Sequence, residues 1–327
     1  TVTGTSFNDI PFFSDGTSMY THDVSGTDNV ASRNTAYGFV AMDAITTGDD
    51  NTAVGYNAGT QINTGADNTV IGAYAGDALT SGGDNVAIGK SALSTEDAHG
   101  RNVAVGAQAL QNQNASANAY NVAVGFQSGL NVTTGIENTL VGGLAGDALT
   151  TGQYNVAIGK SALSTSLDGD HNTAIGVYAL EDYEDGDGNG FNTAVGSQSQ
   201  AQATTGEFNT SLGASSMGVG VTTGDYNVAL GYAAGNAITS GVQNTIIGGL
   251  AGDALTTGGG NIAIGHQALS ASVDGYFNTA VGHLALQDYE DGDGNGHNTA
   301  IGASSQLNAS TGEFNTSLGS LSMGSGV

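Results

Sequence analysis

A five-residue motif, Asn-Thr-Ala-Val-Gly at residues 51–55, recurs with small changes about every seventeen residues along this chain. Seventeen copies are present, and in each the first position is Asn and the fifth is Gly. The copies begin at Asn34, Asn51, Asn68, Asn85, Asn102, Asn121, Asn138, Asn155, Asn172, Asn192, Asn209, Asn227, Asn244, Asn261, Asn278, Asn298 and Asn315. A unit this short cannot bury a core alone, so the period predicts units that stack on one another.

A second level of repetition lies above the first, because residues 121–226 match residues 227–327 at an offset of 106. Duplication of multi-repeat blocks therefore built the array. Residues 1–33 depart from the pattern and contain the single Pro of the chain. We interpret residues 1–33 as an atypical N-terminal capping segment, with a linker from a preceding domain as the alternative, and residues 34–327 as the repeat array.

The first five positions of the repeat predict a short strand followed by a turn. Thr, Val and Ile at positions two and four favour extended backbone, and Gly at position five permits positive φ. A second short strand is predicted after this Gly, for example at residues 75–80, 145–150 and 251–256. Parallel pairing of equivalent strands predicts an all-β fold, a parallel β-solenoid of about 17 rungs, in which the repeat Asn side chains form a hydrogen-bonded ladder.

Position three is usually Ala, and in a strand it points away from positions two and four. We expect positions two and four to be buried and the small residue at position three to face a neighbouring copy of the chain. A strand that is apolar on both faces needs a cover, and no helical segment is predicted to provide one. The pattern therefore predicts a parallel homotrimer. The alternative places position three on a solvated face.

The charge of the chain excludes several functions. Four basic residues stand against thirty acidic ones, giving a formal net charge of -26, which disfavours binding to nucleic acid and to anionic membranes. No apolar run reaches the roughly 18 residues of a membrane span, so no membrane insertion is expected. The charge is typical of a saline, extracellular setting. The chain has no Cys and therefore no disulfide framework.

The motifs at residues 51–55, 85–89 and 155–159 resemble the head repeats of YadA-like trimeric autotransporter adhesins. They are still more similar to the Asn-Thr-Ala-Val-Gly repeats of phage tail-fibre proteins. The resemblance covers residues 34–327 and implies a left-handed, parallel, trimeric β-roll that attaches to cells. The unit of seventeen residues is longer than the adhesin unit.

Two insertions carry the pattern Asp-x-Asp-x-Asn-Gly, whose alternating oxygen ligands are typical of the start of a calcium loop. The candidate calcium ligands are Asp185, Asp187, Asn189, Asp291, Asp293 and Asn295; the alternative is a solvated acidic loop. Tyr183 and Tyr289 on the same insertions are candidate receptor contacts. The six His residues show no metal-ligand spacing, so no His metal site is predicted. The residues expected to serve the scaffold include Asn51, Gly55, Asn68, Gly72, Asn138, Gly142, Asn244 and Gly248.

These patterns together predict a structural and adhesive fibre segment, in a virion tail or on a cell surface, that mediates attachment to host cells. Its partners would be two further copies of the chain and a host-surface glycan or protein receptor. A phage tail fibre is the first interpretation and a bacterial adhesin head the second. No enzyme activity and no required cofactor are predicted. A polysaccharide-degrading tail spike using Glu184–Asp185 and Glu290–Asp291 is a weaker alternative, as is ice binding by the repeated Thr near the turns.

Overall fold

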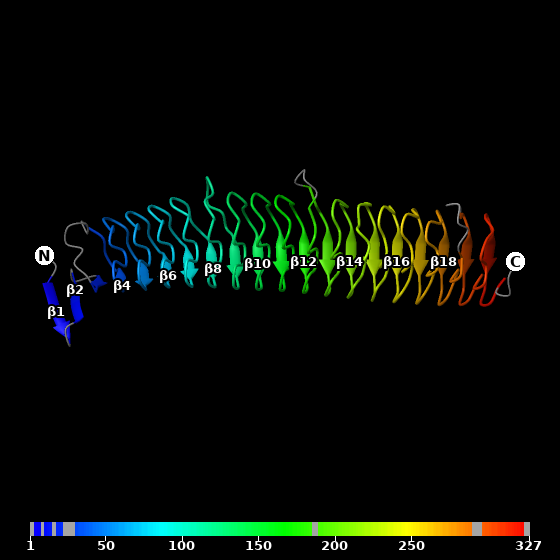
Figure 1. The fold of residues 1–327 in the computed structure, drawn as a ribbon, viewed down its shortest axis with the longest axis horizontal. Helices are drawn as coiled ribbons and strands as arrows, with labels where there is room; N and C mark the ends of the chain where they lie inside the picture. Colours follow the sequence, from blue (N-terminus) through cyan, green and yellow to red (C-terminus); the bar gives the residue numbers. More distant parts are fainter. Residues whose placement is uncertain are drawn as a thin grey trace. The chain divides into compact units, whose positions relative to one another are not determined.

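The computed structural model describes residues 3–7, 10–14, 18–21, 30–184, 189–289 and 296–323. Within these residues the chain is all β, without a helix, and it divides into two compact units, Thr1–Lys160 and Ser161–Val327. Each unit is a parallel β-solenoid with one short strand in each turn (Figure 1). Strands β4 to β20 give about 17 turns, which confirms the predicted fold class.

The chain begins with an antiparallel arrangement before the solenoid starts. Strand β1 (Thr3–Phe7) pairs antiparallel with β2 (Ile10–Ser14), and β2 pairs antiparallel with β3 (Met19–Tyr20). Strand β3 then pairs in parallel with β4 (Thr35–Tyr37), the first strand of the repeat array. The parallel stack of the first unit therefore starts from an antiparallel edge.

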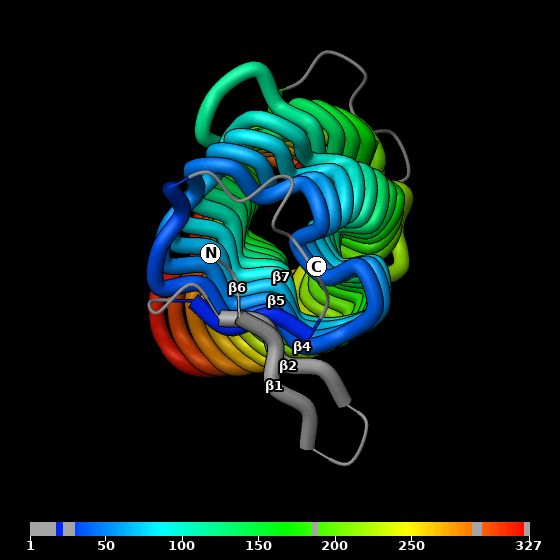
Figure 2. The backbone as a smooth tube through the Cα atoms, turned by 90° about the vertical axis from the view of Figure 1, so that its left-hand side faces the viewer, coloured from blue at the N-terminus to red at the C-terminus, as the bar shows by residue number. Residues whose placement is uncertain are grey.

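The remaining strands each occupy positions two to four of one repeat. In the first unit they are β5 (Thr52–Val54), β6 (Thr69–Ile71), β7 (Val86–Ile88), β8 (Val103–Val105), β9 (Val122–Val124), β10 (Thr139–Val141) and β11 (Val156–Ile158). In the second unit they are β12 (Thr173–Ile175), β13 (Thr193–Val195), β14 (Thr210–Leu212), β15 (Val228–Leu230), β16 (Thr245–Ile247), β17 (Ile262–Ile264), β18 (Thr279–Val281), β19 (Thr299–Ile301) and β20 (Thr316–Leu318). Figure 2 shows β4 to β7 one behind another, and equal repeat positions face each other, as Thr52 faces Thr69.

The repeat Asn residues connect successive turns through their buried side chains. The backbone N–H of Asn51 donates to Oδ1 of Asn34 at 2.8 Å, and Oδ1 of Asn51 accepts the N–H of Asn68 at 3.0 Å. Nδ2 of Asn51 donates to the carbonyl oxygen of Gly65 at 2.8 Å. Because a buried polar group without a partner is costly, these bonds select Asn, which offers both an acceptor and a donor at this position.

This Asn ladder closes over turns of different length. Asn138 bonds to Asn121 across 17 residues at 2.8 Å, whereas Asn121 bonds to Asn102 across 19 residues at 3.1 Å. In the second unit, Asn192 bonds to Asn172 across 20 residues at 3.1 Å. Position twelve stays buried in both longer turns, as Gln113 and Tyr183, and the extra residues follow it, so the strands keep their register.

The repeat Gly at position five is required by close approach of the backbone. Gly142 has φ of 139°, and a Cβ placed there would lie 2.4 Å from the carbonyl oxygen of Gly159. Two residues later Leu144 has φ of 60°, and Gly146 has φ of 55°. This alternation of left-handed residues is a tight corner rather than extended chain. The prediction of a second strand in each repeat is therefore wrong for the described residues.

The strand faces are the reverse of those predicted. Position three points inward and is fully buried, as at Ala53 and Ala87, whereas positions two and four are outside and are half-buried or exposed. The narrow interior has room for only a small side chain in most turns. The predictions that Ala at position three faces another copy of the chain, or solvent, are therefore both wrong. The branched residues at positions two and four form the outer strand face.

Larger core side chains come from the corner after the strand. In one turn Leu93 fills the interior at position nine, beside Ala87 at position three. In the preceding turn position nine is Gly76, and a Cβ there would lie 2.6 Å from Cγ1 of Val70 and 2.8 Å from Cδ1 of Leu79. A large residue at one core position is thus matched by a small one at another, as close packing requires.

Candidate functional site

The residue immediately before each repeat Asn, position zero, points outward. Asp50 and Phe208 illustrate it, with φ of 58° and 55° and exposed side chains. Because the turns of a unit stack in register, these side chains line up as a row along that unit. The position-zero row is the first candidate contact surface, and its chemistry differs between the two units.

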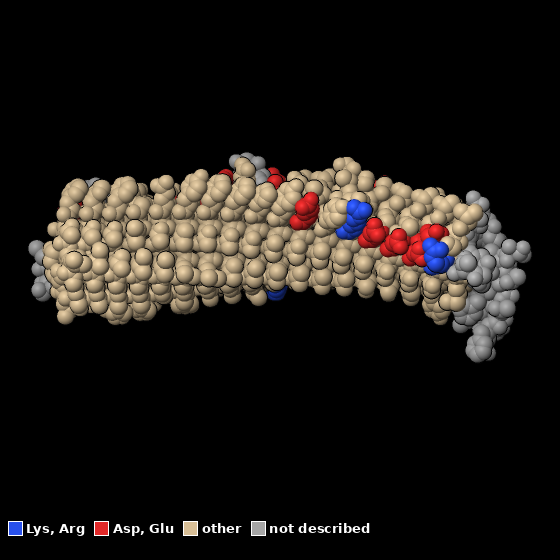
Figure 3. Space-filling model, turned by 180° about the vertical axis from the view of Figure 1, so that it is seen from behind, with Lys and Arg blue, Asp and Glu red and all other residues tan. Residues whose placement is uncertain are grey.

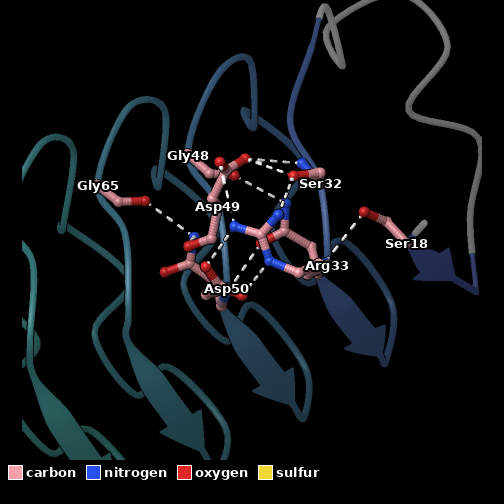
Figure 4. Close-up of polar contacts among 9 residues, drawn as sticks. Ser18, Ser32, Arg33, Gly48, Asp49, Asp50 and Gly65 are labelled. Atoms are coloured by element: carbon pink, nitrogen blue, oxygen red, sulfur yellow. Dashed lines mark hydrogen bonds and ion pairs between the residues drawn. The ribbon is translucent and has the colours of Figure 1, made fainter.

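In the first unit the position-zero row begins with five charged residues, after which Tyr120, Glu137 and Tyr154 follow. The five are Arg33, Asp50, Asp67, Asp84 and Arg101, and Figure 3 shows such a row of acidic side chains between two basic ones. Nε and Nη2 of Arg33 bond to Oδ1 and Oδ2 of Asp50, both at 2.6 Å (Figure 4). This bidentate bond raises the pKa of Arg33 and lowers the pKa of Asp50. Both side chains are exposed, so the pair adds little stability.

In the second unit the position-zero row is aromatic. The rings of His171, Phe191, Phe208 and Tyr226 stack with centroid distances of 4.7, 5.1 and 5.1 Å and interplanar angles of 8° or less. After an interruption at Gln243 and Gly260, the rings of Phe277, His297 and Phe314 form a second stack. The rings cover one another's faces, so their edges meet solvent. Exposed aromatic groups of this kind are typical of contact surfaces.

The outer strand face is the second candidate contact surface. In all seventeen repeats, positions two and four are Thr, Val, Ile, Leu or Tyr, without one charged residue. Ile158 is 37% exposed, and in the second unit Val228 and Leu230 are 40% and 39% exposed. A parallel sheet that exposes a row of branched side chains is unusual, because such sheets are normally covered on both faces.

The two inserted loops, candidates for calcium binding, are only partly described. Asp185, Asp187, Asp291, Asp293 and Asn295 lie outside the described residues. Asn189 is described, and its carbonyl oxygen accepts a hydrogen bond from the Tyr183 hydroxyl at 2.7 Å. The calcium site therefore stays a prediction.

The tyrosines of these insertions lie in the interior. Tyr183 and Tyr289 are both 0% exposed and rank among the largest fully buried side chains. A fully buried ring offers no face on which a glycan can stack, so the predicted receptor contact does not fit either residue. Their rings instead fill the wider interior at the longer turns. Exposed aromatic side chains lie instead in the position-zero row, as at Phe208 and Tyr226, and after the repeat Gly, as at Phe39. Sequence reasoning missed the position-zero row.

A third cluster, Glu96, Asp97 and His99, was also missed, because its spacing matches no common metal motif. One potential ligand atom from each residue lies within 4.8 Å of the others. Glu96 is 0% exposed, and this burial raises the pKa of its carboxyl group. The signal in the sequence is a break in repetition. Residues 85–95 are identical to residues 155–165, but Glu96 stands where the other copy has Ser166.

No family model matches this chain, and comparison with curated proteins finds no match. Among the described residues, no helix is long and apolar enough to cross a membrane.

Proposed function

We propose that this chain is a segment of an extracellular attachment fibre, a phage tail fibre, in which three parallel copies form a trimer. The observation that carries the proposal is the uncharged outer strand face, whose branched side chains remain half-exposed in the single chain. Burying such a face removes apolar surface from water, which is the dominant favourable term in protein association.

The distribution of charge supports association through this face. The chain carries a net charge of -26, yet none of the charged residues occupies positions two or four of a repeat. Three copies can therefore bring their strand faces together without burying an ion. The acidic side chains remain at the corners, where they keep a fibre soluble.

The aromatic position-zero row supports attachment. Phe191, Phe208 and Tyr226 are 43%, 40% and 55% exposed, and such rings are the anchors that interfaces favour. The proposed partner is a host-surface glycan or protein. A bacterial surface adhesin head remains the second proposal, because the same scaffold and rings would serve it. A polysaccharide-degrading tail spike is the weaker third.

The trimer is tested by light scattering of the purified chain, which is expected to give three times the chain mass of 32.3 kDa. The double variant Val228→Asp/Leu230→Asp places two carboxylates on the outer strand face and is expected to weaken the trimer. The matched control, Val219→Asp/Val221→Asp, makes the same chemical change at residues that are 59% and 50% exposed but lie outside any strand. A folded wild-type monomer would overturn the proposal.

Attachment is tested separately by binding of labelled protein to intact bacterial cells. We expect Phe208→Ala/Tyr226→Ala to lower the bound fraction while leaving the trimer intact. A labelled antibody against the chain then distinguishes the phage tail fibre from the bacterial adhesin. It would bind to virion tails in the first case and to the bacterial surface in the second. Equal binding by wild type and the double variant would remove the aromatic row from the proposal.

A further inference from the structure

We propose that Glu96, Asp97 and His99 bind a divalent transition-metal ion, with zinc as the best-fitting ion. Each residue offers one ligand atom, and these atoms lie within 4.8 Å of one another. Two carboxylate oxygens and one imidazole nitrogen form a donor set that zinc accepts, with water as the fourth ligand. The site is independent of the trimer and of attachment.

The central distance fits a shared ion. Nδ1 of His99 lies 3.6 Å from Oε1 of Glu96, which is too long for a hydrogen bond. Two ligands at about 2.1 Å from one ion and separated by that distance subtend roughly 118°, close to the tetrahedral angle. The same Nδ1 atom is buried and has no hydrogen-bond partner in the described structure. A buried nitrogen that lies 3.6 Å from a carboxylate oxygen without a hydrogen bond is therefore positioned to act as a metal ligand.

The carboxylate of Glu96 is held in position by the backbone. Oε1 accepts the N–H of His99 at 3.1 Å, and Oε2 accepts the N–H of Ala115 at 3.4 Å. Each oxygen retains a lone pair for a metal, and such outer hydrogen bonds orient ligands in known metal sites. Asp97 is exposed and His99 is 31% exposed, so an ion can enter from solvent.

The matching turn elsewhere in the chain shows what the position requires without an ion. After an identical run of eleven residues, Ser166 takes the place of Glu96 and Gly169 that of His99. Ser166 is also buried, and its Oγ accepts the N–H of Gly169 at 3.3 Å. Ser therefore suffices to close this corner. In the turn of Glu96 the carboxylate also reaches Ala115 in the next turn, and only here does a His lie beside it.

A bound ion would also stabilise the longer turn that follows. Glu96 contacts Ala115 in this 19-residue turn, and Oδ1 of Asn118 accepts the N–H of Gly100 at 3.0 Å. An ion that fixes Glu96 and His99 therefore acts on both turns at once. Its expected effect is a higher unfolding temperature for the full chain.

The test uses the full chain, stripped with a chelator and titrated with zinc chloride in a calorimeter under excess calcium. Calcium occupies the exposed carboxylates, so one zinc ion per chain is expected to remain measurable. X-ray absorption of the bound zinc should report nitrogen and oxygen ligands without sulfur, since the chain contains no Cys.

Two variants and one control decide the assignment. Glu96→Ser/His99→Gly restores the residues of the matching turn and should weaken zinc binding at least tenfold while the protein stays folded. His99→Ala should do the same and leaves the Glu96 carboxylate and its bonds to backbone N–H groups in place. The control, His266→Ala, alters one of a stacked pair of rings outside the cluster and should leave binding unchanged. Unchanged zinc binding in both test variants, or displacement of zinc by calcium, would overturn the proposal.

Discussion

Removing one amide from the Asn ladder should destabilise its unit far more than removing an exposed amide. Asn138 is 1% exposed, and its Nδ2 donates to the carbonyl oxygen of Gly152 at 2.8 Å. Its Oδ1 accepts the N–H of Asn155 at 3.0 Å. Asn138→Ala leaves these two backbone groups buried without that partner. Each such group costs about 1–3 kcal/mol, so the expected loss is about 2–6 kcal/mol.

The matched control lies seven residues away. Asn131 is exposed, and its Oδ1 accepts a single exposed hydrogen bond from Nδ2 of Asn112 at 3.1 Å. Asn131→Ala should change stability by no more than about 0.5 kcal/mol, as is usual at the surface. Guanidinium denaturation measures the stability of both variants. Hydrogen exchange of the Asn155 backbone amide reports the effect at the group that loses its acceptor. Equal losses in the two variants would refute the reasoning.

An isosteric variant separates the lost donor from the lost volume. Asn138→Asp keeps an oxygen for the N–H of Asn155 but turns a second oxygen toward the carbonyl of Gly152. Burial and this repulsion should raise the pKa of the new carboxyl group in the folded state. The folded protein then binds the proton more tightly, so stability should recover as the pH falls. A pH-independent loss would contradict this account.

Three further outcomes are expected. Gly142→Ala should lower the free energy of unfolding by at least about 1–3 kcal/mol, because its φ is 139° and the added Cβ meets a carbonyl oxygen at 2.4 Å. Its control, Gly143→Ala, where the nearest atom is 4.0 Å away, should lower it far less in the same denaturation assay. Asp147→Asn should stabilise the protein at pH 7, because burial raises the pKa of Asp147, and the gain should vanish in melts below the ordinary value of 3.8. Phe208→Ala breaks two ring stacks of about 0.5–1.5 kcal/mol each, so calorimetric stability should fall by roughly 1–3 kcal/mol.

The period alone predicted the parallel solenoid, because stacked units of equal length must pair equal positions. Which face of the strand is inside could not be predicted from alternation, since Val54 is at least as apolar as Ala53 and Thr52 is a common strand residue on either face. The width of the interior decides which face is buried. In most turns the interior holds the single small side chain of position three, as at Ala53, and the two larger side chains of positions two and four stay outside. Width depends on how tightly the corner bends, and residues such as Leu144 gave no sign of left-handed φ.

The candidate surfaces were harder to predict, because they arise from rows rather than from local motifs. Phe191, Phe208 and Tyr226 are 17 and 18 residues apart, and only a known register brings their rings within 5.1 Å. The Tyr183 ring was assigned to the surface because it lies on an insertion that interrupts the period. The interior at the longer turn, which holds that ring, cannot be inferred from composition.

The Asn ladder has a consequence for how such a chain can change. Its hydrogen bonds stay between 2.8 and 3.1 Å whether a turn contains 17, 19 or 20 residues, as at Asn138, Asn121 and Asn192. Insertions before the repeat Asn therefore leave the neighbouring turns in place. This corner is free to diversify under selection without a compensating substitution elsewhere, and a foreign peptide grafted there would be displayed at a fixed spacing along its unit.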